Sequence, residues 1–526
     1  MLGGIAIMVW SQNYDPFGSL TLSFILAAVP VVVMLVGLGF LHMRAHMAAL
    51  AGLVAALAIS VFAFGMPADK AALAAGYGAA YGLMPIGWIV LNIIFLHRLT
   101  VENGSADILQ NSIASVSDDR RIQLLLIAFS FGAFFEGAAG FGTPVAVTAA
   151  LLIGLGFSPL AASGLSLIAN TAPVAYGALG TPVIALAAVT GLDLLELSAM
   201  IGRQLPFFSL IVPFWLIWAF AGWRGMMEIW PAILVCGVSF AIPQFLVSNF
   251  HGPWLVDIVA ALCSMASLVL FLRVWKPAKV WRSTALLGRE REEDEARRAV
   301  ASATGPVGID GTGGRGGDAG GGGIAVGPGG AAVLTQDRSA VLRAWMPWMV
   351  LTVFVFLWGI PQIKAMLDGL HVVKIPFSGL HNEIQKVPPV VAQPIIEPAV
   401  FNLNYLSMTG SGILLAALVG GFAMGFGPAQ LARIYVQTIW RVRFSLLTIA
   451  IMLALGYLTR YSGLDATLGL AFAHTGVFYP LFGTMLGWLG VALTGSDTAS
   501  NVLFGGLQRI TAEQLNLNPV LMASAN

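Results

Sequence analysis

The chain holds two isolated acidic residues, each within a run of small and polar residues. Residues 122–192 contain a single acidic or basic side chain, Glu136, in the sequence EGAAGFGTP. Residues 475–508 also contain only one, Asp497, in the sequence TGSDTASN. An acid in such apolar surroundings is costly and commonly lies on an ion or substrate pathway. We therefore predict that Glu136 and Asp497 are proton-coupling residues.

Each acid also has a structural interpretation. Burial in a low-dielectric medium penalises a charged carboxylate, so Glu136 can take up and release a proton near neutral pH. The alternative is a structural acid paired with a buried arginine such as Arg203. Asp497 can coordinate a cation or carry a proton, but aspartate is also a favourable residue at a helix N-cap.

The small and polar residues around both acids can bind an anion. Unwound backbone and half-helix N-termini offer N–H groups and a positive dipole end, which hold a carboxylate without a fixed cation. The alternative is that small residues only allow close helix packing. The predicted substrate-binding residues are Gly140, Gly142, Thr143, Asn170, Thr171, Thr494, Ser496, Thr498, Ser500 and Asn501.

Two further polar residues are candidates with competing interpretations. Arg203 can clamp a carboxylate in a bidentate manner, or it can extend from the membrane interface into water. His474 can relay protons, or it can simply satisfy a hydrogen bond near a helix end. No metal site is expected, because His42 and His46 have ligand spacing but no third ligand. No cofactor or catalytic motif is present in the sequence.

Composition indicates which elements must position these residues. Of 526 residues, 58% are hydrophobic and 10% are charged, whereas soluble domains carry about 25% charged residues. The apolar runs predict an all-α polytopic membrane protein with roughly 12 crossings. Several runs are short and interrupted by Gly or Pro, which indicates discontinuous or re-entrant helices. The net charge of +1 and the lack of a basic, aromatic-rich patch argue against a nucleic-acid partner.

The chain divides into two transmembrane halves, residues 1–275 and 343–526. Residues 276–342 form a charged, glycine-rich linker, predicted to be cytoplasmic. The halves resemble diverged, pseudo-symmetric repeats, which we expect to be inverted. Glu136 precedes Asn170 by 34 residues, and Asp497 precedes Asn526 by 29. On this comparison the second half is incomplete at its C-terminus.

Basic residues in the short loops predict the orientation of the protein. Arginines and lysines follow the first and third apolar runs and the last run of the first half. An N-terminus outside the cell places all of them in the cytoplasm. Lys364, Lys374 and Lys386, in a longer loop, would then face outward and count against this orientation.

The motifs resemble those of the L-lactate permease family of proton-coupled lactate and glycolate carriers. The similar segments include GLMPIGWI (82–89), FGAFFEGAAGFGTPVAVTAALLIGLGF (131–157), NTAPVAYGALG (170–180), SNFHGP (248–253) and GWLGVALTGSDTASNVLF (487–504). The resemblance implies a multi-pass protein of the bacterial inner membrane. It implies import of L-lactate, with D-lactate and glycolate as further substrates, by proton symport. It also favours Glu136 and Asp497 as the coupling acids.

Three other functions compete with proton symport. A sodium-coupled carboxylate transporter would use Asp497 as a cation ligand. An intramembrane enzyme would use the two acids as a catalytic pair, but neither lies in a protease-like motif. A passive channel would not accumulate its substrate against a gradient.

Overall fold

A computed structural model describes residues 9–140, 143–281 and 338–526. The prediction that 276–342 is a linker therefore falls largely outside the described residues. The first part of the chain contains β1 (Trp10–Ser11), α1 (Leu20–Gly39), α2 (Ala45–Phe62), α3 (Ala68–Tyr81), η1 (Gly82–Gly87), α4 (Trp88–Glu102), α5 (Ser105–Ala114), α6 (Arg120–Leu124), η2 (Leu125–Phe131), α7 (Gly132–Ala138), α8 (Thr143–Gly154), α9 (Pro159–Asn170), η3 (Val174–Tyr176), α10 (Gly177–Thr190), α11 (Leu194–Glu228), α12 (Trp230–Phe250) and α13 (Val256–Val274).

The second part begins with a helix and a small sheet region. It contains α15 (Arg338–Gly359), α16 (Pro361–Leu370), β2 (Val373–Pro376), β3 (Ile384–Lys386), β4 (Ile395–Ile396), β5 (Val400–Leu403), α17 (Thr409–Ala423), α18 (Pro428–Ser462), α19 (Leu464–Ala473), η4 (Gly476–Phe478), α20 (Tyr479–Thr494), α21 (Asp497–Gln514) and α22 (Pro519–Ser524). β1 pairs with β3 in parallel and β3 with β4 in antiparallel, while β2 and β5 form a separate antiparallel pair.

The prediction of an all-α polytopic membrane protein is confirmed. Within the described ranges, 10 helices are long and apolar enough to cross a membrane, or up to 11 if one bent pair counts as a span. The described residues thus supply 10 or 11 of the roughly 12 crossings expected. The bent pair is α9 with residues 174–190, and the two parts meet at 71°. Two apolar runs that are separate in the sequence thus meet as one sharply bent pair.

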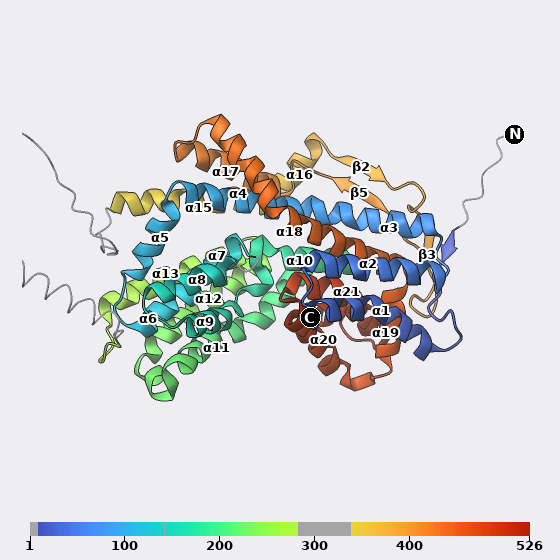
Figure 1. Ribbon diagram of the computed structural model, residues 1–526, viewed down its shortest axis with the longest axis horizontal. Helices are drawn as coiled ribbons and strands as arrows, with labels where there is room; N and C mark the ends of the chain where they lie inside the picture. Colours follow the sequence, from blue (N-terminus) through green and yellow to red (C-terminus); the bar gives the residue numbers. More distant parts are fainter. Residues whose placement is uncertain (1–8, 141–142, 282–337) are drawn as a thin grey trace, which may run out of the picture.

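The helices pack around two main hydrophobic cores, and each core draws on both halves of the sequence. One core combines α4 to α13 with α15, α17 and the start of α18. The other combines α1 to α3 with the rest of α18 and with α19 to α22. Figure 1 shows α7, α8, α12 and α13 toward one end of the molecule and α1, α2, α3 and α19 toward the other, with α10 between them.

The span that carries Glu136 lies entirely inside the protein. Residues 121–138, in α6, η2 and α7, are all buried. A membrane-spanning helix can expose its apolar side chains to lipid, but this span is enclosed by other helices. By contrast, the most apolar parts of α1, α2 and α11 are only 28% buried. Lipid therefore faces the outer helices, and Glu136 reaches the interior of the protein instead of the bilayer.

Candidate functional site

A cavity of about 560 Å³ lies where α7, α9 and α20 end and where α10 and α21 begin. Its remaining wall comes from α1, α2, α8 and α18. No described residue that lines it is Lys, Arg or His. The lining residues with polar side chains, or with backbone close to them, are Glu136, Gly140, Asn170, Gly177, Thr181, Ser445, Thr448, Thr494, Ser496, Asp497 and Thr498.

Glu136 enters this cavity from α7. It is 6% exposed, and none of the ion pairs among the described residues includes it. The amide of Asn170 lies against its carboxyl group, and Asn170 Oδ1 is buried without a hydrogen-bond partner in the described part of the chain. The pairing of Glu136 with Arg203 is wrong, because Arg203 is exposed and donates from Nε to Asn249 Oδ1 over 3.1 Å.

Asp497 lines the same cavity and is the first residue of α21. Its alternative role as an N-cap is wrong, because Ser496 is the N-cap and its Oγ accepts a hydrogen bond from Ala499 N. Gly495 turns the chain with φ of 67° between α20 and α21. The Asp497 carboxylate is therefore free of capping, and within the described ranges it accepts only a 3.4 Å hydrogen bond, from Asn501 Nδ2. It lies within electrostatic range of Glu136.

An unwound segment at the start of α10 forms the wall beside Glu136. Ala178, Leu179 and Gly180 have φ of 45°, 57° and 77°, in the left-handed region that costs about 1–2 kcal/mol for each residue with a side chain. Gly177 packs so closely that a Cβ there would overlap Glu136 Oε1. The break therefore brings irregular backbone into contact with the buried acid.

Two helix N-termini also face the cavity. Val145 in the first turn of α8 and Asp497 at the start of α21 both line it. The first N–H groups of a helix have no partner within the helix, and the dipole makes this end positive. The cavity therefore combines two acids with two ends that attract an anion.

The predicted substrate-binding residues fall into distinct groups. Gly140, Asn170, Thr494, Ser496 and Thr498 line the cavity. Ser500 and Asn501 lie one turn deeper in α21, where Ser500 Oγ donates to Gly487 O and Asn501 Nδ2 donates to Pro182 O. Gly142 lies outside the described residues, and Thr143 is placed only as the first residue of α8.

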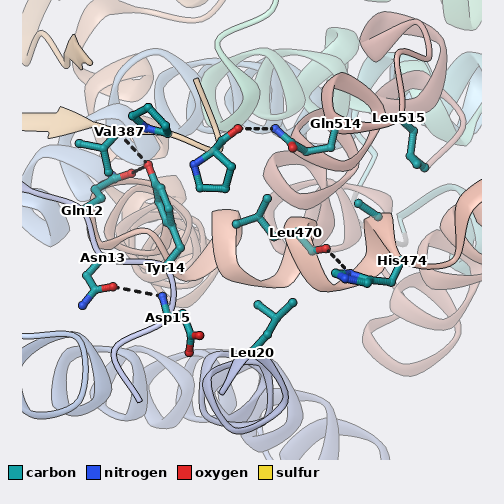
Figure 2. A pocket seen from close by; sticks show the side chains of 13 residues that line it. Gln12, Asn13, Tyr14, Asp15, Leu20, Val387, Leu470, His474, Gln514 and Leu515 are labelled. Carbon is teal, nitrogen blue, oxygen red and sulfur yellow. Dashed lines mark hydrogen bonds between the residues drawn. The ribbon is translucent and has the colours of Figure 1, made fainter. Parts of the chain in front are cut away.

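Three candidates lie away from the cavity. Thr171 is exposed, and its hydroxyl donates to Ile168 O over 2.7 Å. Arg203 does not line the cavity. His474 is exposed, and its Nδ1 lies 3.0 Å from Leu470 O, in the separate cavity of Figure 2.

The cavity of Figure 2 is a less suitable transport site, although its volume is about 620 Å³. Many of its polar groups bond to one another or to nearby backbone. Tyr14 donates to Gln12 Oε1 over 3.0 Å and accepts from Val387 N, and Gln514 Nε2 donates to Pro389 O. These contacts join the N-terminal segment to the strand region and to α21, and they leave few groups for a ligand.

Sequence reasoning missed several parts of the site. Thr181 and the unwound residues before it belong to NTAPVAYGALGTP, whose glycines signalled a break, but no role was assigned to them. Ser445 and Thr448 gave no signal, because isolated hydroxyls on a long helix are common.

Comparison with known proteins was made on the whole chain. A family model described as L-lactate permease matches residues 23–526. The chain is 43% identical to the glycolate permease GlcA of Escherichia coli (strain K12) and 42% identical to the L-lactate permease of Bacillus subtilis (strain 168), in each case over 99% of this chain and 89% of the relative. It is 41% identical to the L-lactate permease of Escherichia coli (strain K12), over 98% of this chain and 88% of the relative. No solved structure matches the chain.

Proposed function

Because the chain belongs to the L-lactate permease family, as a transporter and multi-pass protein of the bacterial inner membrane, we propose that it imports 2-hydroxycarboxylates by proton symport. The substrates are L-lactate, D-lactate and glycolate. The observation that supports this proposal is the cavity in which Glu136 and Asp497 face helix N-termini with no basic residue in its described lining.

The charges in the cavity explain why a proton would accompany the substrate. A carboxylate substrate beside two ionised acids would place three negative charges in one low-dielectric space, where repulsion is strong. Protonation of Glu136 removes one of these charges. The substrate carboxylate then lies against the N–H groups at the start of α8 or α21 and the hydroxyl of Thr498. Release of the proton restores the repulsion and favours departure of the anion.

Asn170 provides a contact for the second functional group of the substrate. Asn170 lines the cavity, and its Oδ1 is buried without a partner among the described residues. A buried acceptor left without a hydrogen bond costs about 1–3 kcal/mol. The hydroxyl group of a 2-hydroxycarboxylate can donate to this oxygen, whereas acetate or propionate cannot.

The first prediction concerns Glu136→Gln. Glutamine keeps the size of the side chain but cannot carry the proton, so accumulation of L-lactate driven by a pH gradient should fall at least tenfold. Exchange of labelled for unlabelled L-lactate should persist, because exchange needs no net proton movement. Uptake of radiolabelled L-lactate is measured in cells lacking other lactate carriers, with and without an uncoupler.

The matched control is Glu196→Gln, an exposed acid in the first turn of α11, which should leave accumulation unchanged. Unchanged proton-driven accumulation in Glu136→Gln would contradict the proposal. Replacement of external sodium by choline distinguishes the sodium-coupled alternative, in which Asp497 would be the cation ligand. Loss of uptake in choline, with no effect of the uncoupler, would favour sodium coupling.

A further inference from the structure

Besides Glu136 and Asp497, a third buried acid, Asp257, packs against α7 next to Glu136. Asp257 is in the first turn of α13 and is 1% exposed. Both of its carboxylate oxygens are buried and have no hydrogen-bond partner among the described residues. An ionised carboxylate in this position would lack both solvation and a counter-charge, which costs several kcal/mol or more.

Close packing of α7 on α13 brings the two acids together. Gly137 follows Glu136, and a Cβ at Gly137 would lie 2.7 Å from Asp257 Cβ and 3.1 Å from Ile258 N. Only a residue without a side chain allows this approach. Asp257 lies within electrostatic range of Glu136, but it does not line the cavity. Of the two acids, only Glu136 therefore meets the cavity.

Few other titratable groups surround Asp257. The elements packed on α13 are α7, η2, α10 and α12, and these contribute Glu136 from α7 and Cys236 from α12, whereas η2 and α10 have no titratable side chain. Cys236 is engaged with Ser130 and Ser264. Tyr176, in η3, lies within electrostatic range of Asp257, but its hydroxyl donates to Ser198 O. Glu136 is thus the one neighbouring carboxyl in the described surroundings.

We propose that Asp257 is a second proton-carrying residue that exchanges a proton with Glu136 during transport. This inference rests on the proposed function. Two adjacent carboxyl groups in low dielectric do not both ionise readily, so they titrate as a pair and not as independent sites. After the anion has left, neutral Asp257 can pass its proton to ionised Glu136, directly or through a water molecule, and Asp257 then takes up a new proton before the next cycle. No covalent bond between heavy atoms changes.

The test uses the full chain in proteoliposomes, with the variants Asp257→Asn, Asp257→Glu, Glu136→Gln and the double variant Glu136→Gln/Asp257→Asn. Net L-lactate uptake driven by a pH gradient and exchange at equal pH are measured in parallel. For Asp257→Asn we expect net uptake to fall at least tenfold, with exchange within about twofold of the unsubstituted protein. The glutamate variant keeps a carboxyl group and should restore part of the net uptake.

The double variant separates a proton relay from an unrelated structural role. If the acids act in series, it should transport no worse than Glu136→Gln alone, because the pathway is already interrupted. Additive losses, or equal losses of net uptake and exchange in Asp257→Asn, would overturn the proposal. So would proton-driven uptake by Asp257→Asn with an unchanged pH profile.

Two controls complete the design. If Asp257→Asn does not reach the membrane, Asp257→Glu decides the question, since a shifted pH profile with normal exchange supports the proposal and an unchanged profile overturns it. The two proposals also fail differently. Retained proton-driven uptake in Glu136→Gln contradicts the proposed function itself. If proton-driven uptake is lost in Glu136→Gln but retained in Asp257→Asn, only the relay is contradicted.

Discussion

At Gly177 a single missing side chain determines whether Glu136 can occupy the cavity. A Cβ at this position would overlap Glu136 Oε1, and the backbone of α10 cannot move away easily because Gly180 already lies against Pro253. Overpacking of this kind costs about 1–3 kcal/mol when the protein adapts to it. Here adaptation requires the carboxyl group itself to move.

We therefore predict that Gly177→Ala reduces pH-driven L-lactate uptake at least tenfold. The control is Gly164→Ala in α9, where an added Cβ meets no atom within 4 Å and helix propensity favours alanine by about 1 kcal/mol. Uptake and thermal unfolding in detergent are measured for both variants. Normal uptake by Gly177→Ala would show that the Glu136 carboxyl does not need the observed position.

The charged residues of the site could be predicted from the sequence, because a lone charge in an apolar stretch is easy to recognise. Glu136 and Asp497 stand out because long apolar stretches contain no other charge, and the structure brings them to one cavity. Arg203 and His474 also stand out by charge, but they lie elsewhere, because sequence spacing does not determine which side of a helix faces the interior. Asp257 shows the reverse case, since its burial depends on how α13 meets α7.

Among the elements, the strand region between α16 and α17 is joined to the membrane helices through a buried ion pair. Glu397 is 6% exposed, and its carboxylate lies 2.5 Å from Lys386 Nζ and 3.1 Å from Arg460 Nη2 of α18. Tyr461 also donates to Pro398 O over 2.7 Å. Burial acts to raise the pKa of Glu397, but the charges of Arg460 and Lys386 prevail and hold this pKa below its ordinary value.

We predict that Glu397→Gln destabilises the folded protein by about 3 kcal/mol, as expected when one partner of a buried ion pair is removed. A carboxyl whose pKa is lower in the folded state contributes stability above its unfolded pKa of about 4.3, and this contribution is lost as the pH falls through the folded value. Thermal unfolding midpoints of the two proteins should therefore differ most near pH 7 and converge on acidification.

The control for this pair is Glu102→Gln, which removes an exposed contact of 3.4 Å with Arg98 on α4. Exposed pairs contribute about 0–1 kcal/mol, so this variant should unfold close to the unsubstituted protein at each pH. The assignment of this stability to the ionised Glu397 would be contradicted by one result. In that result, the difference in unfolding midpoint between Glu397→Gln and the unsubstituted protein stays constant down to about pH 3.5.

The composition predicted that the elements are membrane-spanning helices, but it did not predict which helices pack against one another. Apolar runs predict spanning helices because each run must be removed from water. The packing of α1 to α3 against α18 and α19 joins residues several hundred positions apart, and no periodic pattern encodes that choice. The pairing of α9 with residues 174–190 was likewise not encoded by a pattern, since they are separate apolar runs that meet as one bent pair.

At the scale of the whole molecule, the long helix α18 begins at Pro428 and ends beside the strand region. This helix has 35 residues, which corresponds to about 52 Å at 1.5 Å per residue. Arg433 lies near its first turns and Arg460 near its last, beside the strand region. Of the lysines that count against an outside N-terminus, Lys364 lies in α16, Lys374 in β2 and Lys386 in β3. All three belong to one long folded segment between α15 and α17, and longer segments of this kind cross membranes largely regardless of charge.

We therefore predict that the strand region lies outside the cell and that the start of α18 lies in the cytoplasm. Single cysteines are placed at two exposed positions, Lys374→Cys on β2 and Ala429→Cys in the first turn of α18, with Cys236 and Cys263 replaced by alanine. A membrane-impermeant maleimide should label the first variant in intact cells and the second only after permeabilisation, because the two positions lie toward opposite ends of the molecule. The reverse pattern would invert the orientation and assign the basic loops to the outside, while labelling of both positions in intact cells would contradict a membrane between them.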